Sequence, residues 1–331
     1  MYIVNSYFFA VVLCVITMLC WGSWANTQKL AQKSWRFELF YWDYVIGILL
    51  MSLIFSFTMG SSGELGRSFL TDIRQAQTSN LWNALLGGII FNAANILVAA
   101  AIAIAGMSVA FPVGIGIALV LGVIVNYLAS PQGNSGWLFS GVALITLAIV
   151  LDALAYRKKA SQSQKVPTKG ILLSVVGGVL MALFYRFVAS SMAVHFEQPE
   201  AGMLTPYTAV FVFSVGILLS NFIFNTILMK KPFEGAPVTY PYYFKGSLKE
   251  HFTGILGGMI WCIGMTFSII AAGKAGFAIS YGLGQGATLV AALWGVFIWK
   301  EFKGTRGTAG LLVTMFLLFL IGIGMLIYAG I

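Results

Sequence analysis

The sequence predicts an all-α membrane protein of about ten transmembrane helices, arranged as two inverted repeats of five helices. Three observations lead to this fold class. Of the 331 residues, 59% are hydrophobic and only 9% are charged. A soluble domain carries about 25% charged residues, so lipid must be the solvent for most of this chain. In addition, ten apolar segments have the length of a membrane span, and a glycine-rich stretch recurs in the second half.

Each predicted span is a run of mainly apolar residues, and roughly 20 such residues cross a bilayer as a helix. The third and fourth runs, and the eighth and ninth, are joined by very short links and are expected to form antiparallel hairpins. The first run is expected to be a retained helix, because the preceding MYIVN lacks the basic residues of a signal peptide. The spans are predicted at 6–28, 41–59, 82–104, 109–128, 136–156, 170–190, 207–228, 252–272, 277–299 and 309–329.

The distribution of basic residues predicts the orientation. Loops 29–40, 157–169, 229–251 and 300–308 hold most of the 19 Lys and Arg residues. Because Lys and Arg concentrate in cytoplasmic loops, these loops are expected on the cytoplasmic face of the cell (inner) membrane. An even number of spans then places both termini outside the cytoplasm. The net charge of +9 fits contact with anionic lipid and gives no reason to expect nucleic acid binding.

An internal repeat predicts how the helices are organised. Residues 85–122 align with residues 255–292 at one constant shift and without a gap. Five glycine pairs coincide in this alignment, namely Gly87 with Gly257, Gly88 with Gly258, Gly106 with Gly276, Gly114 with Gly284, and Gly116 with Gly286.

The repeat divides the chain into a first five-helix repeat at 1–156, a basic cytoplasmic linker at 157–169 and a second five-helix repeat at 170–331. Because five is odd, the second half enters the membrane from the opposite side. Inverted halves of this kind alternate access by rocking against each other. Channels also contain inverted repeats, so the repeat alone does not separate a carrier from a channel.

Four passages of the sequence carry a family resemblance: CWGSWANTQKL at 20–30, FYWDYVIGILL at 40–50, AGMSVAFPVGIGIALVLG at 105–122 and LFSGVALITLAIVLDALAYRKKA at 138–160. Together they resemble the drug/metabolite transporter superfamily. More narrowly, they resemble its branch of bacterial glucose/ribose uptake proteins and ureide permeases, and the pair Asp43–Tyr44 is the most ureide-permease-like feature. The resemblance implies a carrier of five plus five spans. Plant ureide permeases carry a long central loop with a nucleotide-binding-like motif, whereas linker 157–169 is short and has no G-x-x-x-x-G-K-[ST], so we expect no ATP use.

Asp43 is the candidate proton-coupling residue. A carboxylate near the start of a span is costly in a bilayer, and taking up a proton during transport would neutralise it. The family resemblance favours this role. The alternative is an interfacial carboxylate paired with Lys29, Lys33 or Arg36.

Arg186 and two asparagines are candidate substrate-binding residues. Arg186 lies deep in the sixth predicted span and could bind a polar solute, or it could extend to the outer interface near Glu197 and Glu200. Asn92 and Asn95 are three residues apart and so share one helix face. Amides supply both donors and acceptors for a solute, but they also form hydrogen bonds between helices.

Gln285 is a further candidate for substrate binding, because Gly282, Gly284 and Gly286 flank it and free backbone groups or permit close approach of neighbouring helices. The alternative is simple tight packing of the glycines. Three aromatic residues complete the predicted binding set, and each adjoins a glycine-rich or polar motif. Aromatic faces stack on sugar surfaces and on planar heterocycles, although interfacial or lipid-facing roles are the alternative. These three residues are Trp21, Trp261 and Tyr281. Asp152 is interpreted as structural.

The leading functional hypothesis is a secondary active carrier that imports a small neutral polar solute by alternating access, with protons or another cation. The family resemblance makes a monosaccharide of the glucose/ribose type the first expectation. A ureide or nucleobase such as allantoin or uracil is the second, and drug or metabolite efflux is the third. An enzyme would need a nucleophile–base pair, a metal cluster or paired carboxylates. Both histidines are expected in loops and the three cysteines lie in apolar runs, so we expect no catalytic residue, metal or cofactor.

Overall fold

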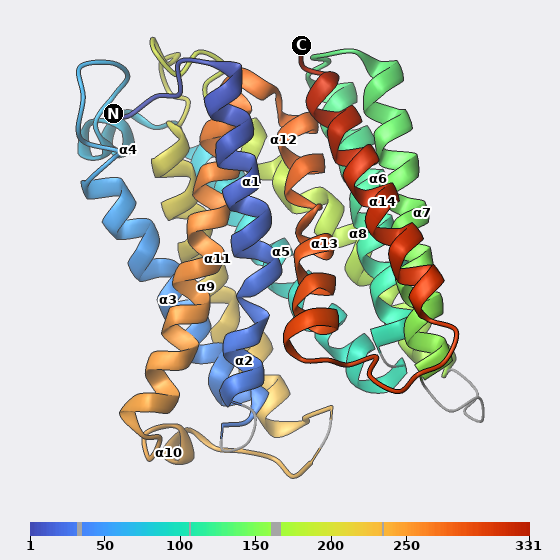
Figure 1. Cartoon of the computed structure of the whole chain (residues 1–331). Helices are drawn as coiled ribbons and strands as arrows, with labels where there is room; N and C mark the ends of the chain where they lie inside the picture. The colour runs from blue at the N-terminus through green and yellow to red at the C-terminus, as the bar shows by residue number, and fades with distance from the viewer. Residues whose placement is uncertain (32–34, 106, 160–166, 234) are drawn as a thin grey trace.

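The computed structural model describes residues 1–31, 35–105, 107–159, 167–233 and 235–331. Its long helices run side by side in one bundle (Figure 1). Both termini lie at the same end of the bundle, which we call the terminal end (Figure 1). The opposite end carries the described parts of the basic loops at 29–40, 229–251 and 300–308, and we call it the basic end (Figure 1).

Helices account for all ten predicted spans. In the described ranges, nine helical segments are long and apolar enough to cross a membrane, and α6 supplies the remaining span. Apart from one isolated bridge between Met192 and Leu204, these ranges form no β-structure. The prediction of an all-α membrane protein of about ten helices is therefore confirmed. The spanning helices are α1 (Tyr7–Ser23) continued by α2 (Ala25–Ala31), α3 (Phe37–Phe57), α5 (Thr78–Ala105), α6 (Met107–Ala129), α7 (Ser135–Lys159), α8 (Thr168–Ser191), α9 (Pro206–Lys230), α11 (Leu248–Ala275), the series α12 (Phe277–Gly284), α13 (Ala287–Leu293) and η1 (Trp294–Ile298), and α14 (Ala309–Tyr328).

Local sequence signals set the ends of several helices. Ser247 and Glu250 form a capping box at the start of α11, in which each side chain accepts a hydrogen bond from the other residue's backbone. Pro206 begins α9, where its missing N–H is not needed. Gly276 has a φ of 81° and lets the chain reverse directly from α11 into α12, as the very short predicted link requires. Its repeat partner Gly106 lies outside the described residues.

The ninth span is not one continuous helix. The α-helix stops after Gly284 and resumes at Ala287, so that Gln285 and Gly286 form a tight turn in which the Gly286 N–H donates to the carbonyl of Leu283 at 2.9 Å. Glycine is a poor helix former, and two glycines flank Gln285. After α13 the helix loosens into the π-helical turn η1, a feature that is frequent at functional sites. Interrupted spans occur where backbone lines a cavity.

Helix contacts recur in matched pairs under the sequence repeat. The helix α5 packs against α8 and α9, and its repeat partner α11 packs against α1 and α3. A Cβ added to Gly88 would lie 2.0 Å from the carbonyl oxygen of Phe213, and one added to Gly258 would lie 1.9 Å from that of Tyr44. Only glycine permits such a close backbone approach. Aligned glycines of the repeat therefore form two helix crossings that are built alike.

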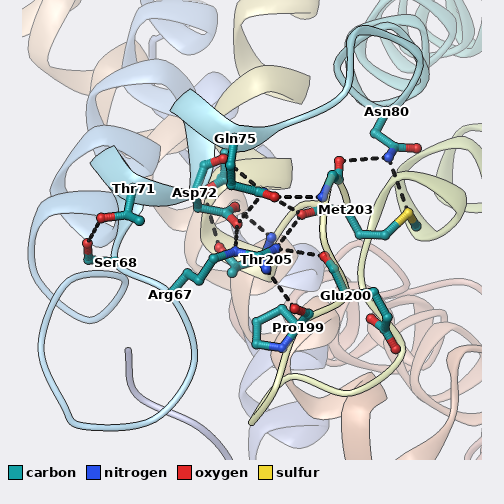
Figure 2. Close-up of polar contacts among 12 residues, drawn as sticks. Arg67, Ser68, Thr71, Asp72, Gln75, Asn80, Pro199, Glu200, Met203 and Thr205 are labelled. Atoms are coloured by element: carbon teal, nitrogen blue, oxygen red, sulfur yellow. Dashed lines mark hydrogen bonds and ion pairs between the residues drawn. The ribbon is translucent and has the colours of Figure 1, made fainter.

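A polar cluster at the terminal end ties two loops together (Figure 2). Arg67 donates to the Asp72 carboxylate at 2.8 Å and to the carbonyls of Pro199 and Met203 at 2.6 Å each. Asp72 lies on the short helix α4 (Phe69–Gln75), is fully buried, and accepts a second hydrogen bond from the backbone N–H of Thr205 at 2.7 Å. We call this cluster the terminal clamp. It fastens the α3–α5 connection to the α8–α9 connection.

Candidate functional site

A cavity of about 860 Å³ enters the bundle from the basic end. This volume suits a small-molecule ligand. Residues at the basic end, among them Lys29, Arg36 and Glu301, line its mouth, and side chains from the middle of four helices and from the break in the ninth span line its inner part. These inner residues include Trp21, Phe91, Phe184, Trp261 and Gln285.

Buried hydrogen bonds close the bundle between this cavity and the terminal end. The Tyr185 hydroxyl lies 3.0 Å from the Ser268 hydroxyl, and Ser280 donates to the Ser268 carbonyl at 2.6 Å. All three side chains are fully buried. The cavity is therefore open toward the basic end and closed toward the terminal end.

Aromatic rings form one wall of the cavity. Trp21 and Trp261 stack with ring centroids 5.9 Å apart and an interplanar angle of 14°. The Trp21 indole N–H donates to the Trp261 carbonyl at 3.2 Å, which fixes the pair. Phe91 packs against Trp261, with the ring centroids 4.4 Å apart. The wall is aromatic, apolar and held in place, so it suits the face of a planar ligand.

Two amides face the same cavity. Asn95 donates to the Tyr41 hydroxyl at 3.1 Å, and Gln285 lies at the break between α12 and α13. Within the described part of the chain, the Gln285 side chain and the Asn95 carbonyl oxygen have no hydrogen-bonding partner. Both groups are therefore open to a ligand, and together they offer donors and acceptors.

Asn92 and Tyr281 lie outside the cavity lining. Asn92 is fully buried, accepts from the Tyr41 hydroxyl at 2.9 Å and donates to the Ser220 hydroxyl at 2.9 Å. Tyr281 is also fully buried, and its hydroxyl lies 3.1 Å from the carbonyl of Ala118. Both residues join helices.

Arg186 likewise does not line the cavity. It is partly exposed on α8, and it forms no ion pair with any residue that the structure describes. The neighbouring acids have other partners, because Glu197 pairs with Lys274 at 3.6 Å and Glu200 with His195 at 2.8 Å. His195 is exposed in the α8–α9 connection, and the sequence predicts it in a loop.

Asp43 is buried at the basic end and is surrounded by donors. The Trp35 indole N–H donates to Oδ2 at 2.9 Å, the Tyr243 hydroxyl donates to Oδ1 at 2.6 Å, and His251 Nδ1 lies 2.8 Å from Oδ1. Tyr243 belongs to the short helix α10 (Tyr240–Tyr243), outside the spans. Burial and the hydrogen bond to Asp43 raise the pKa of the Tyr243 hydroxyl, which therefore stays a donor. Asp43 thus joins α3, the α2–α3 connection, α10 and α11.

These contacts correct two expectations about Asp43 and its surroundings. Lys29 pairs with Glu301 at 2.6 Å and Arg36 with Glu38 at 2.9 Å, so neither is the partner of Asp43. Lys33 lies outside the described residues. His251 lies in the first turn of α11 and not in a loop, because the capping box starts that helix at Leu248.

Comparison with known proteins decides the family. A sequence model of the ureide permeases matches residues 40–169 and 163–329, which cover most of the chain. The chain belongs to the ureide permease family. It is therefore a membrane transporter with a small-molecule substrate.

Similar ureide permeases span the whole chain. Ureide permease 1 and Ureide permease 2 of Arabidopsis thaliana are 22% and 23% identical to it over 383 and 391 residues, and both comparisons cover 98% of each chain. A putative sugar uptake protein of Lactiplantibacillus plantarum is 23% identical over 208 residues, or 61% of this chain and 63% of that protein. One solved crystal structure superposes with a TM-score of 0.63 over 96% of this chain and 95% of that one, at 15% identity, which shows the fold alone.

The sequence did not point to two residues of the cavity lining or to two partners of Asp43. Phe91 and Phe184 were absent from the predicted set, and so were the Asp43 partners His251 and Tyr243. A signal for Phe91 was present, because the repeat aligns it with Trp261. His251 and Tyr243 had no such signal, since they reach Asp43 only through tertiary packing.

Proposed function

We propose that this ureide permease family member imports a planar, neutral, hydrogen-bonding solute of the ureide or nucleobase class by proton-coupled alternating access. The observation that carries the proposal is the cavity in which the stacked pair Trp21–Trp261 lies with the unpaired carbonyl oxygen of Asn95 and the side chain of Gln285. An aromatic wall suits a planar ring, and amides match the alternating N–H and C=O groups of ureides and pyrimidines. The full-length likeness to ureide permeases favours this substrate over the monosaccharide first expected.

During the transport cycle, the cavity would close toward the basic end and open toward the terminal end. The cavity is open at the basic end, which the positive-inside rule assigns to the cytoplasm, so this arrangement would release solute inward. The matched crossings at Gly88 and Gly258 support two inverted halves, 1–156 and 170–331, with the linker 157–169 between them. Rocking of these halves would open the terminal end. A reporter fused after Ile331 that is active only in the cytoplasm would overturn this orientation in the cell membrane.

Asp43 is the proposed proton-coupling residue of the second span. Its carboxylate accepts from three donors that belong to other parts of the chain. A proton on Asp43 would remove the charge that holds these donors and loosen the basic end. Solute uptake would then be coupled to proton uptake through this rearrangement.

Uptake into proteoliposomes under an imposed proton gradient tests the function. The panel contains allantoin, uracil, ribose and glucose, each labelled. We expect saturable accumulation of allantoin or uracil that an uncoupler abolishes. Accumulation of ribose or glucose alone would overturn the substrate class in favour of a sugar. Flux that does not saturate and shows no countertransport would indicate a channel.

A further inference from the structure

Asp152 on α7 lies in the wall of the cavity, and its Oδ1 atom is buried without a hydrogen-bonding partner. In the part of the chain that the structure describes, neither oxygen of Asp152 accepts a hydrogen bond. By contrast, the carboxylates of Asp43, Asp72 and Glu301 all accept hydrogen bonds. Asp43 and Asp72 accept from several donors, and Glu301 accepts from Lys29 at 2.6 Å and from the Tyr156 hydroxyl at 2.8 Å.

The charged groups around Asp152 do not neutralise it. Glu301, which also lines the cavity, repels it. The Lys29 ammonium is held by Glu301, and Lys159 lies 5.8 Å from the centre of the Tyr156 ring. The helices packed against α7 are α6 and α14, and neither carries an Asp, Glu, Lys, Arg or His. Asp152 is half-buried, and an ionised carboxylate there would have no donor among the described residues of the protein, which is costly in a membrane protein.

We propose that Asp152 is a proton-binding site in the wall of the transport cavity and that it binds its proton together with the solute. The cavity connects Asp152 to the water at the basic end, so a proton reaches its carboxylate oxygen from solvent and returns there. The proton neutralises the carboxylate, which then no longer needs a donor to stabilise its charge, and it removes the repulsion from Glu301. This proposal rests on the proposed transport function.

Solute binding and proton binding are linked by dehydration. A solute that fills the cavity displaces water from the Asp152 carboxyl. A carboxyl group that loses its water prefers the neutral form. By thermodynamic linkage, protonation of Asp152 then strengthens solute binding by the same factor. The expected result is cotransport, in which the solute and the proton bound at Asp152 move together.

Asp152→Asn tests this site, with Asp152→Glu as the variant that keeps a carboxyl and Glu64→Gln as a control at an exposed outer carboxylate. Two rates are measured in proteoliposomes with allantoin and uracil: exchange at equal pH, and accumulation driven by a pH gradient. We expect Asp152→Asn to lower accumulation relative to exchange by about tenfold or more, the usual range of coupling between two sites. Asp152→Glu should recover part of this ratio. An unchanged ratio in Asp152→Asn would overturn the proposal.

Infrared difference spectroscopy between two pH values gives a readout that needs no transport. The wild-type protein should show C=O bands of protonated carboxylic acids, and the component that comes from Asp152 should be missing in Asp152→Asn. If the wild type transports neither allantoin nor uracil but the band behaves as expected, the substrate class is wrong and the proton site stands. If transport occurs and the band is the same in Asp152→Asn, the proton site is wrong and the transport function stands.

Discussion

Asn92 and Asn95 lie one helical turn apart on α5, yet their amides have different partners. Asn92 is sealed between α3 and α9, where it both accepts from Tyr41 and donates to Ser220. Asn95 shares the Tyr41 hydroxyl but also reaches the cavity. A turn of α-helix rises about 5.4 Å, which is enough to separate a helix-joining amide from a ligand-facing one.

The two asparagines therefore give a matched pair of variants. Asn95→Ala should weaken solute binding by about fivefold, because one net hydrogen bond contributes about 1 kcal/mol, and should leave stability nearly unchanged. Asn92→Ala should lower the free energy of unfolding by about 1–3 kcal/mol, because Tyr41 and Ser220 lose a buried partner. Solute affinity and thermal unfolding in detergent separate the two effects. Equal losses of affinity in both variants would contradict this division.

Asp43→Asn tests the coupling role of the second-span carboxylate. The amide keeps the shape of the side chain but cannot carry the charge that Trp35, Tyr243 and His251 contact. We expect uptake to lose its response to the proton gradient, while uptake at equal pH persists. The measurement is initial uptake across a series of external pH values. A wild-type pH profile in Asp43→Asn would remove Asp43 from the coupling mechanism.

Some of the residues that the sequence singled out lie in the cavity lining, and local sequence features were the signal for them. The glycines around Gln285 indicated an unusual backbone, and the structure places that residue at a helix break in the cavity. Trp21, Trp261 and Asn95 also line the cavity. The only signal for Arg186 was that an arginine is rare in an apolar span. This signal does not indicate whether the side chain faces the cavity.

At the scale of elements, the glycine crossings fix how close the helices lie. Gly258→Ala would place a methyl group 1.9 Å from the carbonyl oxygen of Tyr44 on α3, so α11 and α3 would have to separate. Overpacking of this kind costs about 1–3 kcal/mol or more. We expect a clear loss of thermal stability and of folded yield. Gly116→Ala is the matched control, because a Cβ at that position meets no atom within 4 Å, and it should behave as wild type.

The contact between α2 and the segment after η1 should depend on pH. Partial burial acts to raise the pKa of Glu301, but hydrogen bonds from Lys29 and Tyr156 outweigh it and hold the pKa below its usual value. A carboxyl whose pKa is lower in the folded state adds stability above its unfolded pKa and loses it as pH falls through the folded pKa. Glu301→Gln should therefore lower stability at neutral pH by up to about 1 kcal/mol. Thermal unfolding across pH should show this difference disappear in acid, and a constant difference would contradict it.

For the whole molecule, the order and length of the helices follow from the sequence because each span must satisfy its own backbone in lipid. Spans were therefore placed within a few residues, including 309–329 against α14 at Ala309–Tyr328. The interruption of 277–299 was not placed, because hydropathy does not record hydrogen bonding inside a span. The cavity and the closed terminal end depend on contacts between distant helices, such as Tyr185 with Ser268, that periodicity cannot reveal.

The terminal clamp should set the balance between the two ends of the transporter. Arg67→Ala leaves Asp72 buried without its cation, and breaking a buried pair in this way costs about 3–5 kcal/mol in the arrangement that contains it. Arrangements with an open terminal end should then become more populated. Cys14 reports this, because it is fully buried beside Ser280 at 3.7 Å on the closed path.

In a Cys20→Ser, Cys262→Ser background, an impermeant thiol reagent applied at the terminal side should label Cys14 about a hundredfold faster or more in Arg67→Ala than in the parent. Arg74→Ala, at an exposed arginine on the same short helix, should label as the parent does. Adding Asp72→Asn to Arg67→Ala removes the unpaired buried charge and separates opening from local unfolding. Fast labelling in this double variant, with an unchanged unfolding temperature, would place the clamp in the transport cycle, and parent-like labelling would make it a purely structural contact.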